Sequence, residues 1–186
     1  MSTRDTIIAT ADKFIREDGY NAFSYKDIAQ KVGIRTASVH YYFPTKTDLG
    51  VATVRYHIQL FEAVKAKLAN EGPMAKLNWL LENYHKTNAE HKICLVGALA
   101  TAFNTVEAPI QQELKLFADD LLQWVTQFLE DGKILGEFHF SLPARTRAIM
   151  IIGNMLAIVQ LARLTDNADV QRVQEAIIDE LTKQPI

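Results

Sequence analysis

One stretch decides the fold of this chain, and it reads YKDIAQKVGIRTASVHYYF over residues 25–43. Apolar residues recur at helical spacing on both sides of Gly33, a residue that readily adopts the backbone needed in a tight turn. Two short helices joined by such a turn form a helix-turn-helix. The stretch therefore predicts helices over about 25–32 and 35–42, with Gly33 between them.

The second of these helices has two faces of different character. Val39 and Phe43 are four residues apart, which places them on one apolar face that we expect to point inward. Small and polar side chains on the outward face of such a helix allow close approach to the major groove of DNA. The residues expected on that face are Thr36, Ala37, His40 and Tyr41.

In nearly every other segment of the chain, apolar residues also recur at helical spacing, and the alternation of apolar and polar residues that is typical of strands is almost absent. We therefore predict an all-α fold of about nine helices. An N-terminal three-helix domain over residues 1–48 precedes a larger helical domain over 49–186, and a long helix near 46–70 links them. The remaining helices are expected near residues 3–18, 74–88, 91–106, 109–131, 143–164 and 168–182, with a loop over 132–142.

Composition narrows the class of protein. With 48% hydrophobic residues in 186, the chain can bury a core, and its net charge of −2 excludes a uniformly basic surface. The charge is uneven, because residues 1–70 carry ten Lys/Arg against seven Asp/Glu, while residues 71–186 carry ten against fifteen. The single cysteine, the polar N-terminal residues and a longest uncharged run of only 15 residues predict a cytoplasmic protein without a membrane span.

The run DIAQKVGIRTASVHYYFPTKTDL, residues 27–49, resembles the signature of the TetR family of bacterial transcriptional regulators. Its most diagnostic part is Tyr42-Phe43-x-x-Lys46-x-x-Leu49, and the resemblance is strongest over residues 4–50. It implies a dimeric, ligand-responsive regulator, most simply a repressor that leaves a palindromic operator when a small-molecule inducer binds. It also implies base or groove contacts by Thr36, Ala37, His40 and Tyr41, and phosphate contacts by Ser24, Arg35, Ser38, Tyr42 and Lys46.

One residue departs from the family pattern. The family often has tyrosine where this chain has His40, so the contact made there is expected to differ. Because histidine titrates near neutral pH, DNA affinity is expected to depend on pH at this position.

The last two predicted helices carry the expected dimer interface. The helix near 143–164 is apolar on nearly every side, and the helix near 168–182 has an apolar stripe, so we predict a four-helix interface with a second copy. The alternative is that residues 143–164 form the central helix of a monomer. The residues assigned to the interface are Ile152, Leu156, Val159, Val170, Val173, Ile177 and Leu181.

Large aromatic and amide side chains are frequent among the middle helices, where they either fill a core or line a ligand pocket. The resemblance implies an inducer pocket, to which we assign Trp79, Phe103, Phe117, Trp124 and Asn154. The run KICLVGAL, residues 92–99, also resembles a helix start in electrophile-responsive members of the family, so Cys94 is a candidate thiol sensor. The alternative is that Cys94 is a buried, inert residue.

No pattern indicates a metal site, a cofactor or a catalytic centre. His85, His91 and Cys94 do not match the ligand spacing of a tetrahedral zinc site. Nucleotide-binding glycine patterns and nucleophile elbows do not occur either. We therefore expect a non-enzymatic regulator; the alternatives are a helical ligand-binding or scaffold protein that never contacts DNA, and a small helical enzyme.

Overall fold

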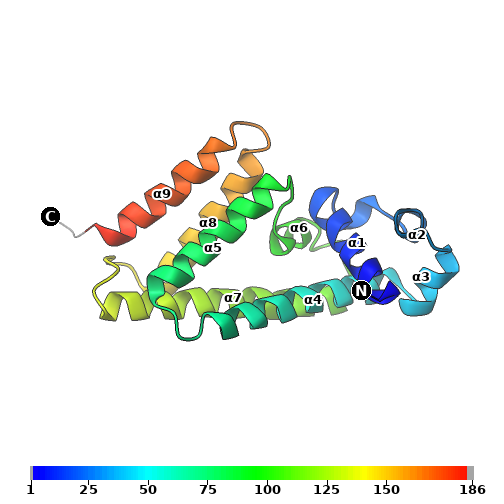
Figure 1. Cartoon of the computed structure of the whole chain (residues 1–186), viewed down its shortest axis with the longest axis horizontal. Coiled ribbons are helices and arrows are strands. Elements are labelled where there is room, and N and C mark those ends of the chain that lie inside the picture. Colours follow the sequence, from blue (N-terminus) through cyan, green and yellow to red (C-terminus); the bar gives the residue numbers. More distant parts are fainter. Residues whose placement is uncertain (1, 184–186) are drawn as a thin grey trace. The chain divides into compact units, whose positions relative to one another are not determined.

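The computed structural model describes residues 2–183. Within this range the chain forms nine α-helices, one short 3-10 helix and no strand, which confirms the all-α prediction (Figure 1). The elements in chain order are α1 (Thr3–Glu17), η1 (Tyr20–Ala22), α2 (Tyr25–Val32), α3 (Thr36–Tyr42), α4 (Lys46–Lys67), α5 (Pro73–Ala89), α6 (Leu95–Thr101), α7 (Ala108–Ile134), α8 (Ala144–Leu161) and α9 (Ala168–Thr182).

The chain divides into two compact units. The N-terminal unit comprises the described residues up to Val64 together with Cys94–Ala118, and the C-terminal unit comprises Lys65–Ile93 and the described residues from Asp119 onward. The helices α4 and α7 each contribute residues to both units. The boundary therefore falls inside two continuous helices instead of in a loop.

The core of the N-terminal unit is formed by apolar stripes of the first three helices. Ile7, Ala11 and Ile15 of α1 and Ile28 of α2 are buried, and α2 packs against both α1 and α3. Gly33 ends α2 in the left-handed conformation with φ +78°, and its N–H and that of Ile34 both bond the Ala29 carbonyl, at 2.9 and 3.0 Å. This is the tight turn that the sequence predicts.

The helices α4 and α7 make side-chain contacts along their length. At Gly50 of α4 an added Cβ would lie 2.5 Å from Ile110 Cδ1 of α7, so only glycine permits this close approach. Further along, Arg55 Nη2 lies 2.6 Å from Glu113 Oε1 in the N-terminal unit. Within the C-terminal unit Lys65 Nζ donates to the Asp120 carboxylate at 2.7 Å. Each unit thus has its own ion pair between the two helices.

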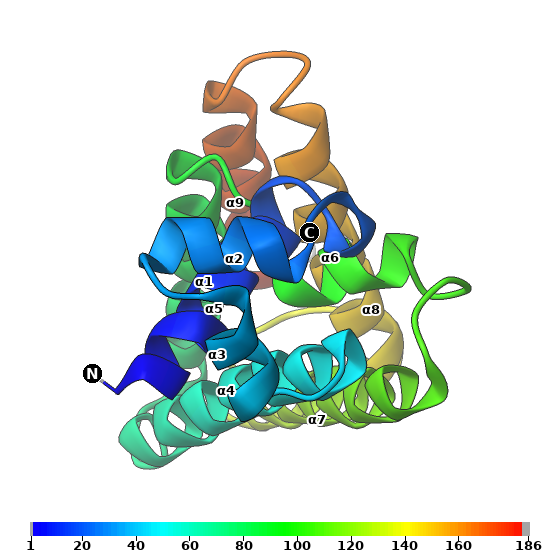
Figure 2. The same ribbon diagram turned by 90° about the vertical axis from the view of Figure 1, so that its right-hand side faces the viewer.

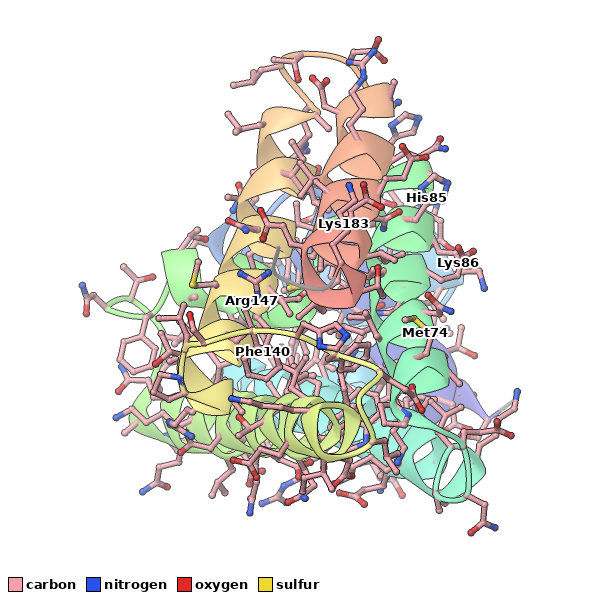
Figure 3. All side chains as sticks on the ribbon, turned by 90° about the vertical axis from the view of Figure 1, so that its left-hand side faces the viewer. Met74, His85, Lys86, Phe140, Arg147 and Lys183 are labelled. Carbon is pink, nitrogen blue, oxygen red and sulfur yellow. The ribbon has the colours of Figure 1, made fainter. Side chains whose placement is uncertain are left out.

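The C-terminal unit is built on α5, α8 and α9. Figure 3 shows α9 beside α8, which carries Arg147, and α5, which carries Met74, His85 and Lys86; α5 and α8 also pack directly against each other. Gln174 Nε2 of α9 donates to the Leu81 carbonyl of α5 at 2.6 Å. The side chains buried between these helices include Leu77, Leu80, Tyr84, Ile151, Met155, Val159, Val170, Ile177 and Leu181.

The predicted helix over 91–106 is wrong in its extent, because α6 is confined to Leu95–Thr101. The preceding helix α5 ends at Ala89, and two residues later His91 has φ 57° although it is not a glycine. The His91 N–H bonds the Asn88 carbonyl at 2.9 Å and the Lys92 N–H bonds the Thr87 carbonyl at 3.0 Å. These bonds close the end of α5 without the glycine that normally marks such a cap.

Three other helix ends also differ from the prediction. The helix α4 ends at Lys67 and α8 at Leu161, each three residues early, whereas α7 continues to Ile134 through the predicted loop residue Gly132. Gly132 serves close packing here, since an added Cβ would lie 2.1 Å from Phe138 Cδ2. The Phe138 ring is buried directly against the helix backbone at this point.

Gly132→Ala is therefore expected to lower the free energy of unfolding by about 1–3 kcal/mol, because the buried Phe138 ring has to move. The matched control is Gly72→Ala, where the nearest atom to an added Cβ is Glu137 Oε1 at 3.9 Å. Urea denaturation of both variants measures the difference. Equal stability of the two variants would show that the contact at Gly132 is relieved without cost.

Candidate nucleic-acid interface

The helix α3 is fixed to its unit by one buried face. Val39 is 0% and Phe43 is 3% exposed, which confirms the predicted inward face. The C-terminal end of α3 is also held by Tyr25 of α2, whose hydroxyl donates to the Phe43 carbonyl at 2.8 Å and also contacts the Thr45 carbonyl. Burial raises the pKa of Tyr25 to about 12, so this hydroxyl keeps its proton at neutral pH.

The opposite face of α3 is open to solvent (Figure 2). All four residues predicted to contact bases are exposed, and Tyr41 is 82% exposed, resting edge-on against Tyr42 with ring centroids 5.2 Å apart. An aromatic ring this exposed contributes little to the protein's own core. The four residues are Thr36, Ala37, His40 and Tyr41.

The residues predicted to contact phosphate lie at both ends of this face. Arg35 and Tyr42 are exposed, and Ser38 is half-buried. Ser24 is also exposed, but its N–H and its hydroxyl both donate to Asp27 Oδ2, at 2.8 and 2.7 Å. The N–H bond belongs to the capping box at the start of α2, and the second bond occupies the Ser24 hydroxyl proton.

Lys46 is held inside the unit. Its Nζ donates to the Phe23 carbonyl at 2.5 Å and lies 4.2 Å from the centroid of the Phe23 ring and 4.7 Å from that of Tyr20. Burial lowers the pKa of this ammonium group. The geometry therefore gives Lys46 a second role, tying the start of α4 to the segment before α2.

One basic residue beside α3 was missed by the sequence reasoning. The Arg4 guanidinium lies 5.3 Å from the centroid of the Phe43 ring, so α1 brings a positive charge to the C-terminal end of α3. The sequence alone does not predict that Arg4 contacts Phe43, because this contact depends on how α1 packs.

A half-buried polar pair, also missed, joins α1 to α4. His57 Nε2 lies 2.6 Å from Asp12 Oδ1, and Arg16 Nη1 lies 3.5 Å from the other Asp12 oxygen. Burial acts to raise the pKa of the Asp12 carboxyl, but the hydrogen bond and charge of His57, together with Arg16, outweigh it and hold that pKa below its usual value.

Asp12→Ala is expected to lower the free energy of unfolding at pH 7 by about 1.5–3 kcal/mol, the range for hydrogen bonds to charged groups. Because the folded pKa is lowered, this stabilisation is present above the unfolded value of about 3.9 and is lost as the pH falls through the folded pKa. Urea denaturation at pH 7 and pH 3 measures it, with Asp18→Ala as the exposed control. If the free energy of unfolding of wild type exceeded that of Asp12→Ala by the same amount at both pH values, the charged Asp12 carboxylate would not be the source of the stabilisation.

The residues assigned to a ligand pocket fall in three places. Trp79 and Trp124 meet edge-to-face in the C-terminal unit, with centroids 5.8 Å apart, and Trp79 lines a groove between α5 and α9 of about 470 Å³. Asn154 is exposed and lines a separate groove on α8 and α9. Phe103 and Phe117 belong to the N-terminal unit, so the five residues are not gathered within one unit.

The residues assigned to the dimer interface divide into two groups. Val159, Val170, Ile177 and Leu181 are at most 5% exposed and pack inside their own unit, so they are poorly placed to meet a second copy. Ile152, Leu156 and Val173 are half-buried. The apolar stripe predicted for the helix near 168–182 reports burial, and burial against α8 and α5 satisfies it for Val170, Ile177 and Leu181.

Cys94 is half-buried at the start of α6. Its Sγ accepts the Gly97 N–H at 3.2 Å, a contact that favours a thiolate. The ammonium of Lys92 lies 2.7 Å from Glu90 Oε2, which already partly neutralises that charge.

Comparison with known proteins agrees with this architecture. The family model for bacterial regulatory proteins of the tetR family matches residues 7–53, which contain α2 and α3, and the model for the tetracyclin repressor-like C-terminal domain matches residues 73–177. The chain belongs to the TetR family. Its helix-turn-helix is thus the DNA-binding domain of a transcriptional regulator.

Other TetR-family proteins resemble the chain over nearly all of its length. A TetR regulator from Legionella pneumophila is 32% identical with a TM-score of 0.87, and one from Agrobacterium tumefaciens is 29% identical with a TM-score of 0.90; each match covers 97% of both chains. The regulator CymR of Pseudomonas putida is 34% identical over 74 residues, which is 39% of this chain and 36% of CymR. The chain therefore matches only about a third of the length of CymR.

Proposed function

We propose that this TetR-family protein is a repressor that binds a palindromic operator as a dimer in the cytoplasm and releases it when a small-molecule inducer binds. The observation that carries the proposal is the exposed face of α3, whose opposite face is locked by buried Val39 and Phe43. Side chains on that face contact bases, while Arg35, Tyr42, Ser24, Ser38 and Lys46 contact phosphates, as the family pattern implies. For Lys46 this contact requires the ammonium to leave the Phe23 carbonyl.

The exposed apolar surface of α8 supports dimerisation. Among the described residues, α8 is the one helix whose length and mean hydropathy of 1.2 would suit a membrane span, yet only 28% of it is buried. Arg147 near its start bonds Glu180 of α9 at 2.6 Å, which ties this helix into the unit. A second copy is the partner that TetR-family architecture provides for the apolar remainder.

We place the dimer interface on the groove shared by α8 and α9, which measures about 340 Å³. Of the four buried residues of the sequence prediction only Ile177 lines this groove, so the interface moves to a neighbouring face of the same two helices. Leu161 on this face is 53% exposed. The residues lining the groove are Asn154, Ala157, Ile158, Leu161, Val173, Ala176, Ile177 and Glu180.

We place the inducer site in the C-terminal unit at the α5–α9 groove. Its volume of about 470 Å³ lies within the range of small-molecule sites. One wall is the Trp79 ring, which Trp124 supports edge-on, and the other lining includes Gln171, Gln174 and the carboxylates of Glu82 and Glu175. Such a lining suits a ligand with both an apolar body and hydrogen-bonding groups.

Coupling between inducer and operator follows from the contacts of α4. This helix is paired with Asp120 through Lys65, with Glu113 through Arg55 and with Asp12 of α1 through His57. A displacement of α4 is therefore passed to α1, which packs against α2, and α2 in turn packs against α3. An inducer that binds better to the displaced state shifts the population away from DNA.

Cys94 adds a second input to the proposed regulator. We expect iodoacetamide to modify Cys94 in the folded protein at pH 7 at least as fast as in the urea-unfolded chain, because the Gly97 N–H stabilises the thiolate. Mass spectrometry of timed samples measures both rates. Protection of the thiol in the folded protein would end the sensor assignment and leave Cys94 as a small core residue.

The proposal is tested by selection from a pool of duplexes with a randomised central segment. We expect enrichment of an inverted repeat whose half-sites are about 10–10.5 base pairs apart, or a multiple of that spacing. A protein that enriches no sequence would instead be a helical ligand-binding or scaffold protein without specific DNA binding.

A further inference from the structure

The imidazole of His40 is held in one orientation by groups of its own unit. Nδ1 lies 3.3 Å from the Pro44 carbonyl oxygen, and the ring meets the Tyr25 ring edge-on, with centroids 4.7 Å apart. Tyr25 is itself buried and bonded to the Phe43 carbonyl. The ring is therefore positioned before any DNA arrives.

This contact determines which ring nitrogen carries the proton. A backbone carbonyl can only accept a hydrogen bond, so Nδ1 must be the donor. In a neutral imidazole the other nitrogen, Nε2, then has a lone pair and acts as an acceptor. Within residues 2–183 Nε2 of His40 has no protein partner, and the side chain is exposed beside Thr36 and Tyr41.

We propose that His40 reads an adenine or a cytosine in the major groove by accepting a hydrogen bond at Nε2 from the exocyclic amino group of that base. This rests on the proposed function, since it assumes that α3 enters the groove. Adenine N6 and cytosine N4 are the major-groove donors, whereas guanine and thymine present only acceptors at their edges. A guanine or thymine facing Nε2 would bring two acceptor lone pairs together, and neither acceptor would receive a hydrogen bond.

Protonation of the ring reverses this preference. The added proton occupies Nε2, and the acceptor becomes a donor suited to guanine or thymine. The titratable group that the ring contacts is Tyr25 of α2, whose hydroxyl remains neutral near neutral pH because burial raises its pKa. Histidine is the side chain that ordinarily titrates between about pH 5 and 8.

The test uses the duplex that the wild-type protein enriches from a randomised pool at pH 8. Each adenine or cytosine of a half-site is replaced in turn by purine or pyrimidin-2-one, which lack the exocyclic amino group. Titration by fluorescence anisotropy then compares wild type with His40→Ala. At one position we expect a loss of about 2- to 12-fold for wild type, the worth of one hydrogen bond, and no loss for His40→Ala.

Two internal controls are built in. Amino deletion at the other positions is expected to affect wild type and His40→Ala equally. His40→Gln, whose amide also offers an acceptor, is expected to keep the response to amino deletion.

The outcomes separate this proposal from the proposed function. Suppose that wild type enriches a specific duplex while every amino deletion weakens the binding of wild type and of His40→Ala equally. In that case the hydrogen bond to Nε2 is wrong, but operator binding stands. If residue 40 proves to face guanine or thymine at pH 8, the assigned acceptor is also wrong. If no sequence is enriched, operator binding itself fails, and this proposal fails with it.

Discussion

Leu161→Glu is expected to convert the protein into a monomer and to weaken operator binding by about 100- to 10,000-fold, the usual contribution of a second linked site. Leu161 is 53% exposed in the single chain and lines the groove shared by α8 and α9. The substitution therefore leaves the unit's own core intact. In a dimer it would place a carboxylate in an apolar contact, where an unpaired charge is strongly unfavourable.

The matched control is Leu135→Glu, which makes the same chemical change at a residue that is 65% exposed at the end of α7. Sedimentation velocity measures the oligomeric state, and fluorescence anisotropy measures the affinity for the selected duplex. If Leu161→Glu remains dimeric and Leu135→Glu does not, the interface lies on α7 and the placement on α8 and α9 is contradicted.

Ala37→Glu is expected to weaken binding to the selected duplex by at least about 100-fold, because like charges at an interface cost several kcal/mol. Ala37 is exposed in the first turn of α3. A side chain at this position that enters the major groove lies near the negatively charged phosphates of both DNA strands. Glutamate is a good helix former, so α3 itself is expected to stay intact.

Ala63→Glu, at an exposed position in the C-terminal part of α4, is the control for the added charge. Its affinity is expected to stay within about twofold of wild type, since surface substitutions away from a site usually change free energies by less than about 0.5 kcal/mol. Equal affinities of the two variants would mean that α3 does not face the DNA.

The sequence predicted the helix-turn-helix well because its determinants are local. Gly33 sets the turn, Ser24 and Asp27 start α2, and Val39 with Phe43 define the inward face; each of these signals lies within a few residues of the structure that it produces. The start of α6 was misplaced because the turn that separates it from α5 has its left-handed residue at His91, which is not a glycine.

Contacts between distant segments could not be predicted in the same way. Asp12 and His57 are 45 residues apart, and neither residue type indicates a partner until α1 and α4 are packed. The dimer face could not be predicted from the sequence for a related reason. Apolar periodicity shows that Val170 and Leu181 are buried, but it does not distinguish burial inside the unit from burial against a second copy.

The central claim is that two symmetry-related copies of α3 lie in successive major grooves. The most direct test attaches an iron chelate to a cysteine introduced by Ala37→Cys, in protein that also carries Cys94→Ser, and maps hydroxyl-radical cleavage of the selected duplex. We predict two clusters of cuts related by the dyad of the site, with centres about 34–36 Å apart along the DNA. A single cluster, or the same pattern from a chelate placed by Ala63→Cys, would contradict the account.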